Sequence, residues 1–162
     1  MSRMTRKSLK FLHTMGSIGY LGAILALAVL HGLLPPPTEL QEFASLRIAM
    51  GAIAEWILLP SIGIVLVSGL FAIAASRSYQ SAGWVWVKLA TGILVFEGTL
   101  VYVQAPMERA ALQARAALEG QVSVAELAAP LSAEWGSFWV LGAVAVLNVV
   151  LGVWRPRFRK SS

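Results

Sequence analysis

Four long apolar runs, separated by short polar segments, dominate the pattern of the chain. Each run contains at least the ~20 mainly apolar residues that a helix needs to cross the hydrocarbon core of a bilayer. The runs are Leu9–Leu34, Leu46–Ala75, Trp84–Ala105 and Trp135–Trp154. The pattern therefore predicts an all-α, polytopic membrane protein, in which residues 1–162 form a single transmembrane domain built as a four-helix bundle.

Turn residues mark the ends of the predicted helices. Pro35 to Pro37 follow the first run and end it, because proline lacks the backbone N–H and disfavours helix at the residue before it. The link at 107–134 contains an alanine-rich stretch, Met107–Leu118, that is interrupted by charges and closed by Gly120. We expect this link to be an outer loop that carries a short helix of its own.

Composition supports a membrane protein. Hydrophobic residues make up 57% and charged residues 13% of the chain, and the mean hydropathy is +0.72, whereas ~25% of the residues of a soluble domain are charged. The net charge of +5 comes from basic residues that crowd the two termini. Because they form no stripe on a soluble face, a nucleic-acid partner is not expected. The absence of cysteine excludes disulfides and thiolate metal sites.

The distribution of charge predicts how the chain is oriented. Basic residues lie before the first run, in the link after the second run and after the fourth run, whereas the other two links are rich in glutamate. By the positive-inside rule, both termini and the second link are cytoplasmic. The basic residues are Arg3, Arg6, Lys7, Lys10, Arg77, Arg155, Arg157, Arg159 and Lys160.

Both histidines of the chain lie in the first run. His13 and His31 are separated by ~5 whole turns, so both project from one face of the helix, ~27 Å apart along its axis. Tyr20 and Leu27 fall on the same face. The helix thus presents one imidazole near each membrane surface.

Two glutamates interrupt the runs where an ionised group is costly unless it is paired or hydrated. By helix rise, Glu55 lies ~13 Å and Glu97 ~12 Å from the outer ends of their predicted helices. Because the depths are similar, we expect the two carboxyls to share a pocket in the outer half of the bundle and to hold a proton at neutral pH. The pocket would serve catalysis, proton or cation transfer, or would only fix helix packing.

Two further groups of polar or sulfur-containing side chains are candidates. Lys88 lies one turn inside the inner end of its run, where its stem can reach the headgroups. His31 shares the outer end with Met50 and Met107, and His/Met sets suit copper or haem iron. Methionine is also an ordinary filler of apolar helices. The candidate metal ligands at the outer end are therefore His31, Met50 and Met107.

Short motifs in three runs resemble those of a family of four-helix bacterial membrane proteins that is related to CopD copper-resistance proteins and to HemJ, the membrane protoporphyrinogen oxidase. The motifs are Lys10-Phe-Leu-His13 with Tyr20 in the first run, Leu59-Pro60-Ser61 and Ser68-Gly69-Leu70 in the second, and Trp84-x-x-x-Lys88 in the third.

The resemblance implies a multi-pass protein of the bacterial inner membrane that binds haem b. His13 would be the haem ligand, and Trp84 and Lys88 would lie near a propionate or a substrate carboxylate. Tyr20, which stands where relatives usually have tryptophan, would also lie at the cofactor. No histidine follows Lys88 in the third run, so the pattern offers no second imidazole at the inner end.

Three functions follow as alternatives. The first is a haem-associated redox protein resembling HemJ, with an oxidoreductase activity. The second is a CopD-like copper or proton transport protein that uses Glu55, Glu97 and the outer group of His31, Met50 and Met107. The third is a structural or assembly protein without a catalytic site. The expected partners are the lipid bilayer, a small-molecule or metal ligand and, in a homo-oligomer, a second copy of the chain.

Reporter fusions test the orientation. Reporters at both termini should give a cytoplasmic signal, and a reporter in the 107–134 link should give an external one, because every basic segment is then inside. Alkaline phosphatase and fluorescent-protein activities measure the two outcomes. A cytoplasmic signal from the 107–134 link would overturn the four-helix topology.

Overall fold

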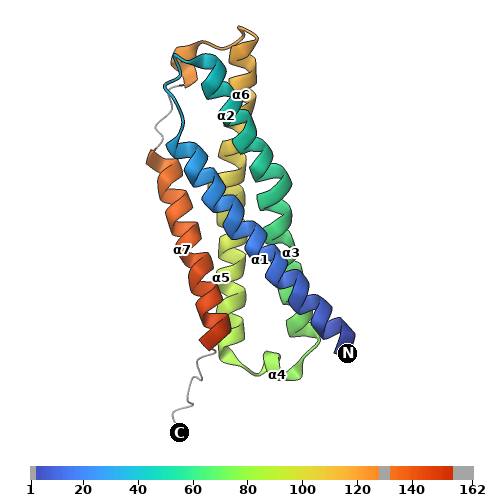
Figure 1. Ribbon diagram of the computed structural model, residues 1–162. Coiled ribbons are helices and arrows are strands. Elements are labelled where there is room, and N and C mark those ends of the chain that lie inside the picture. The colour runs from blue at the N-terminus through green and yellow to red at the C-terminus, as the bar shows by residue number, and fades with distance from the viewer. Residues whose placement is uncertain (1–2, 128–131, 155–162) are drawn as a thin grey trace.

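The computed structural model describes residues 3–127 and 132–154, and four long helical segments in these ranges are apolar enough to cross a membrane (Figure 1). The first is α1 (Arg3–Gly32) and the fourth is α7 (Ser132–Trp154). The second is one continuous segment that consists of α2 (Leu40–Ile53), η1 (Ala54–Leu58) and α3 (Leu59–Ala74). The third is also continuous and consists of α5 (Gly83–Thr99), η2 (Leu100–Gln104) and α6 (Ala105–Leu118). The links contain the short helices α4 (Arg77–Gln80) and η3 (Val124–Leu127). The predicted all-α, four-helix fold is confirmed.

Each of the two continuous segments contains a proline, and the helical turn just before that proline is wider than an α-helical turn. The elements η1 and η2 are π-helical turns, and Pro60 and Pro106 lie in the first turns of the α-helices that follow them. A proline ring collides with the carbonyl four residues earlier, and the wider turn relieves that collision. The helix therefore continues, and the predicted break before a separate outer helix at Met107 is wrong.

The continuous segments are longer than a membrane requires. They contain 35 and 36 residues, or ~50 Å of helix against ~30 Å of hydrocarbon. In Figure 1, α2 and α6 accordingly extend beyond the ends of α1 and α7, where they pack on each other. A small core of Phe43, Ala117 and Leu127 joins them to η3. We call α2, α6 and η3 the head. The second helix thus begins at Leu40, earlier than the sequence pattern predicts.

One hydrophobic core joins the long segments. Leu27 of α1, Met50 of α2, Leu58 of η1 and Val103 of η2 are fully buried in it, together with Phe138 of α7. Large apolar side chains also cover the outside, as expected of helices that face lipid. Examples are Trp56, Phe71, Leu94, Trp139 and Trp154.

Small residues set the closest helix contacts. A Cβ atom added at Gly16 of α1 would lie 2.9 Å from the Ser61 carbonyl oxygen of α3 and 3.0 Å from the Val65 side chain. A Cβ atom added at Gly51 of α2 would lie 2.7 Å from the Ala111 Cβ of α6. Glycine therefore allows both helix pairs to approach more closely than any larger residue would permit.

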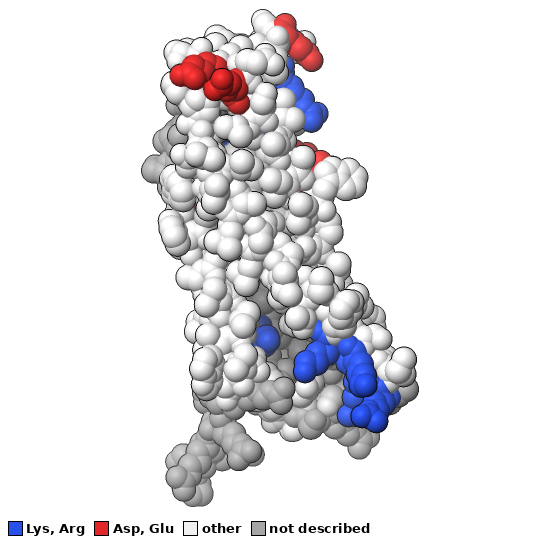
Figure 2. Space-filling model, in the orientation of Figure 1, with Lys and Arg blue, Asp and Glu red and all other residues white. Residues whose placement is uncertain are grey.

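The two ends of the molecule differ in charge. Figure 2 shows basic side chains gathered where α1 begins and acidic side chains on the head. Arg3, Arg6, Lys7 and Lys10 are exposed on the first turns of α1, and we call this end the basic end. The last described turn of α7 lies at the same end (Figure 1), as an even number of crossings requires. The basic residues from 155 onward lie outside the described residues, and the cytoplasmic location of the termini stays a prediction.

The close crossing of α1 and α3 predicts that Gly16→Ala lowers stability. The added methyl group meets a backbone carbonyl, so we expect an overpacking cost of ~1–3 kcal/mol in the free energy of unfolding. Gly22→Ala on the same helix is the matched control, because a Cβ there meets nothing within 4 Å and alanine favours helix. Thermal unfolding in one detergent measures both. Equal stability of the two variants would contradict the close crossing.

Candidate functional site

The imidazole of His13 is anchored to α3 by its Nδ1 atom, which lies 3.0 Å from the Val65 carbonyl oxygen and 3.1 Å from Ser68 Oγ. A carbonyl oxygen can only accept a hydrogen bond, so Nδ1 carries the hydrogen. Ser68 Oγ donates its own hydrogen to the Ile64 carbonyl at 2.6 Å and can accept from His13. The ring is therefore held as the Nδ1–H tautomer, and Nε2 keeps its lone pair.

Space beside the His13 ring comes from a glycine. A Cβ atom added at Gly69 would already touch the ring at 3.6 Å from Cε1. A larger side chain there would displace the imidazole from Val65. Ser68 therefore holds the ring by a hydrogen bond, and the adjacent Gly69 leaves room for the ring.

Lys88 of α5 acts electrostatically on His13. Lys88 is half-buried, and its Nζ atom lies so close to α7 that a Cβ added at Gly152 would be 2.6 Å from it. One turn further along α5, Thr91 Oγ1 donates to Asn148 Oδ1 of α7 at 2.9 Å. Figure 2 shows a recess in this half of the surface with a basic side chain inside it. Polar groups from all four long segments thus gather in the half of the bundle next to the basic end.

Tyr20 and Trp84 have other contacts. The Tyr20 hydroxyl lies 2.9 Å from Thr99 Oγ1, and both residues are fully buried, so this hydrogen bond ties α1 to α5 in the middle of the bundle. The Trp84 ring lies edge-on to the Tyr79 ring, with 6.1 Å between centroids. The predicted roles of Lys88, Tyr20 and Trp84 at a cofactor therefore all stay predictions.

His31 belongs to a buried ionic cluster at the head end. Its Nδ1 atom approaches Glu134 Oε2 to 3.0 Å, and Arg47 Nη1 donates to the same oxygen at 2.8 Å. The rings of Trp135 and Phe138 pack edge-on against the imidazole, with centroids at 5.1 and 5.6 Å. His31 and Arg47 are each only 3% exposed. The carboxylate of Glu134 thus neutralises Arg47 beneath the head.

The sequence pattern missed this cluster because its three members come from different helices. Arg47 and Glu134 each lie at the outer edge of an apolar run, where a charged residue is ordinarily solvated. One signal was available. Glu134 immediately precedes Trp135 and an apolar run, and an acidic residue at that position needs a partner if the helix end is covered.

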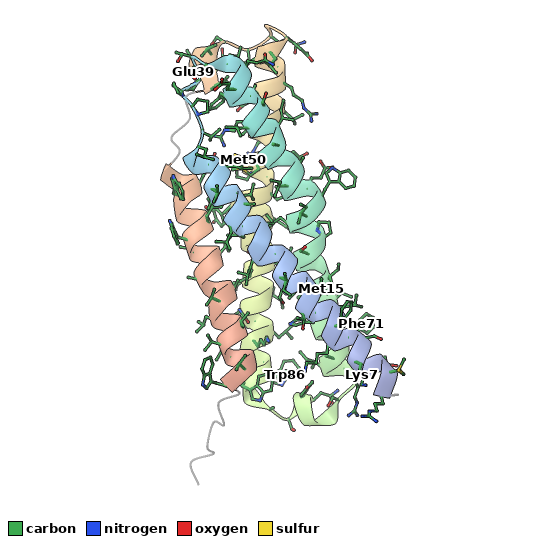
Figure 3. All side chains as sticks on the ribbon, in the orientation of Figure 1. Lys7, Met15, Glu39, Met50, Phe71 and Trp86 are labelled. Carbon is green, nitrogen blue, oxygen red and sulfur yellow. The ribbon has the colours of Figure 1, made fainter. Side chains whose placement is uncertain are left out.

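The predicted outer metal group is only partly assembled. Met50 and Met107 are both fully buried in the central core (Figure 3 labels Met50). His31, however, faces Glu134, and Arg47 places a positive charge beside any cation that would bind there. No three His, Asp or Glu side chains in 3–127 and 132–154 gather closely enough to hold a metal ion.

Glu55 and Glu97 do not lie in a shared buried pocket, contrary to our expectation. Both residues are exposed, and neither carboxyl bonds to another side chain in the described ranges. The reason for Glu55 is the length of its helix. A membrane crossing of ~20 residues that ends at Ala74 begins at Glu55, which puts this side chain at the membrane boundary. The exposed indole of Trp56 beside it is typical of that boundary.

Glu97 lies deeper than Glu55. Counting ~20 residues forward from Gly83 reaches the exposed Tyr102, which leaves Glu97 ~7 Å short of the boundary. Its carboxyl lies on the outer surface of α5. A role for either glutamate in catalysis or proton transfer stays a prediction and would have to use each one singly.

Comparisons with protein-family models, with curated proteins and with solved structures find no match to this chain. The geometry of the chain itself therefore carries the functional argument.

The ionic cluster predicts a large stability effect at Glu134. Glu134→Gln keeps the shape of the side chain but leaves Arg47 buried without its counter-charge, which should cost ~3–5 kcal/mol in the free energy of unfolding. Denaturant unfolding in mild detergent measures the change. Glu126→Gln is the control, because Glu126 is exposed and, in the part of the chain that the structure describes, bonds to Ser123. It should shift stability by less than ~0.5 kcal/mol.

A second variant separates charge from packing. The double substitution Arg47→Met/Glu134→Leu removes both charges and should recover most of the stability lost in Glu134→Gln. If Glu134→Gln and Glu126→Gln unfold alike, the cluster does not stabilise the head end.

Proposed function

We propose that the protein is a haem-associated redox protein of the membrane, in which His13 supplies the axial ligand. The observation that carries this proposal is the anchoring of His13 Nδ1 to the Val65 carbonyl at 3.0 Å. Metal-binding histidines usually donate their other ring N–H to a carbonyl or carboxylate, which fixes the tautomer and the orientation of the ring. The anchored ring therefore has the form that a ligand through Nε2 requires.

The charge of this half of the bundle suits a haem propionate. All eight acidic residues lie either between Glu39 and Glu55 or between Glu97 and Glu134, so the chain places none near its basic end. Lys88 adds a positive charge within electrostatic reach of His13. An anionic group bound beside the imidazole would be favoured by this field. In the proposed site, Lys88 pairs with a propionate, as the resemblance to HemJ implies.

The remaining polar groups would position the ligand residues. Ser68 holds His13 through its hydroxyl, and the Thr91–Asn148 bond joins α5 to α7 one turn from Lys88. When bound, haem would supply one-electron redox chemistry, and its axial ligand and hydrogen bonds would tune the potential. His31 would take no part, because it lies ~27 Å from His13 along α1.

Haem titration of the purified protein tests the proposal. Addition of haemin should give a Soret band that saturates with the parent protein and with Thr14→Ala, an exposed neighbour of His13. His13→Ala should lose the band, and added imidazole should restore it by filling the space that the substitution leaves. Lys88→Met keeps the stem without the charge and should weaken binding by at least about tenfold, since a charged hydrogen bond contributes ~1.5–3 kcal/mol.

Two outcomes would contradict the proposal. The first is a parent protein that gives no saturable Soret band. The second is a His13→Ala variant that binds haemin as tightly as the parent does. In either case, the anchored imidazole would serve only to hold α1 against α3.

A further inference from the structure

A groove runs between α1 and α3 on the outer surface of the bundle, next to the basic end. It has a volume of about 510 Å³, within the ~300–1,000 Å³ range of small-molecule sites. Its walls are apolar apart from one hydroxyl, that of Ser68. The lining residues are Leu9, Leu12, Pro60, Gly63, Ile64, Val67, Ser68 and Phe71.

The length of the groove matches one leaflet of a bilayer. From Phe71, near the basic end, to Pro60, near the middle of the bundle, α3 rises ~16 Å. Half of a ~30 Å hydrocarbon core is ~15 Å. With the membrane boundary at Ala74, the groove begins ~4.5 Å inside the boundary at Phe71 and ends ~21 Å inside it at Pro60. An acyl chain in this groove would therefore run from near the membrane surface past the bilayer midplane.

Positive charge lies next to the end of the groove that Leu9 lines. Arg6 is one turn before Leu9 on α1, and residues three apart are neighbours on a helix surface. Arg3, Lys7 and Lys10 extend this cluster, all four side chains being exposed. Figure 3 labels Phe71 and Lys7 at this same end of the molecule. The groove thus combines an apolar wall of leaflet depth with cations at headgroup height.

We propose that this groove is a specific site for an anionic phospholipid, with one acyl chain between α1 and α3 and the phosphate on the basic residues of α1. Basic pockets between membrane helices are suited to anionic headgroups. A second copy of the chain fits less well, because parallel copies joined at this groove would bring two basic clusters together. The acyl chain would also cover Ser68, and with it the lipid-facing side of the His13 anchor.

Gly63→Leu tests the apolar half of the site. A Cβ atom at Gly63 meets nothing within 4 Å, so the leucine side chain can enter the groove without a clash. Gly22→Leu on α1 is the matched control, because its Cβ also meets nothing within 4 Å and the residue does not line the groove. If Gly63→Leu fails to fold, Val67→Phe fills the groove from an exposed position.

The measurement is photocrosslinking in nanodiscs of equimolar phosphatidylcholine and phosphatidylglycerol with matched acyl chains. A diazirine in one acyl chain, placed on either lipid, labels the protein, and peptide mapping locates the label. We expect phosphatidylglycerol to label the lining positions on α1 and α3 several-fold more than phosphatidylcholine. Gly63→Leu should lose this preference, and Gly22→Leu should keep it.

The charged half is tested by Arg6→Gln/Lys7→Gln. Loss of each cation near an anionic headgroup should weaken the preference about fivefold, which corresponds to ~1 kcal/mol. Arg109→Gln/Arg115→Gln removes the same charge from the head and should leave the preference unchanged.

Three results would overturn the proposal. The first is equal labelling of the groove by the two lipids, and the second is unchanged labelling in Gly63→Leu. The third is a groove that lipid does not label because a second copy of the chain occupies it. A parent protein with the mass of a dimer and a Gly63→Leu variant without it would reveal this third result.

Discussion

Three polar side chains on one face of α1 fix how that helix sits in the bundle. Each is paired with a different helix, at a different height. The partners are Glu134 on α7 for His31, Thr99 on α5 for Tyr20, and Val65 and Ser68 on α3 for His13. Turning α1 by one residue, ~100°, would aim all three groups away from their partners. Each buried polar group left unpaired costs ~1–3 kcal/mol, so this face alone selects one rotation of α1.

The crossing of α1 and α3 follows from that rotation and from glycine. With the polar face turned inward, Gly16 meets Ser61, and a bare backbone is needed there. The close approach lets His13 reach a carbonyl of α3 that is already part of a helix. The same contact leaves a groove beside it, toward lipid, between Leu12 and Phe71. One helix crossing therefore produces both the anchored imidazole and the groove.

Much of the fold follows from apolar periodicity and charge, but helix length and long-range pairing do not. The four crossings and the basic end could be read from run length and from residues such as Lys7. The continuation of α5 into α6 could not, since a proline ordinarily ends a helix, and the apolar pattern does not reveal that a π turn carries the helix past Pro106. Taking the whole run Leu46–Ala75 as membrane-spanning also put the outer membrane boundary in the wrong place, which made Glu55 appear deeply buried. The pairing of His31 with Glu134 depends on where α7 begins in space, and no local pattern encodes it.

The two histidines have the same side chain but opposite surroundings. At the head end, Arg47 donates to one carboxylate oxygen of Glu134, so the two charges compensate each other. The rings of Trp135 and Phe138 pack edge-on against His31. At the basic end, backbone and hydroxyl groups of the described residues hold His13 by its Nδ1 atom, and the charge of Lys88 near it is positive. A neutral, closed cluster is suited to hold helix ends together. An imidazole that is anchored through Nδ1 in the half of the bundle next to the basic end is the arrangement on which our proposal of a haem ligand at that end rests.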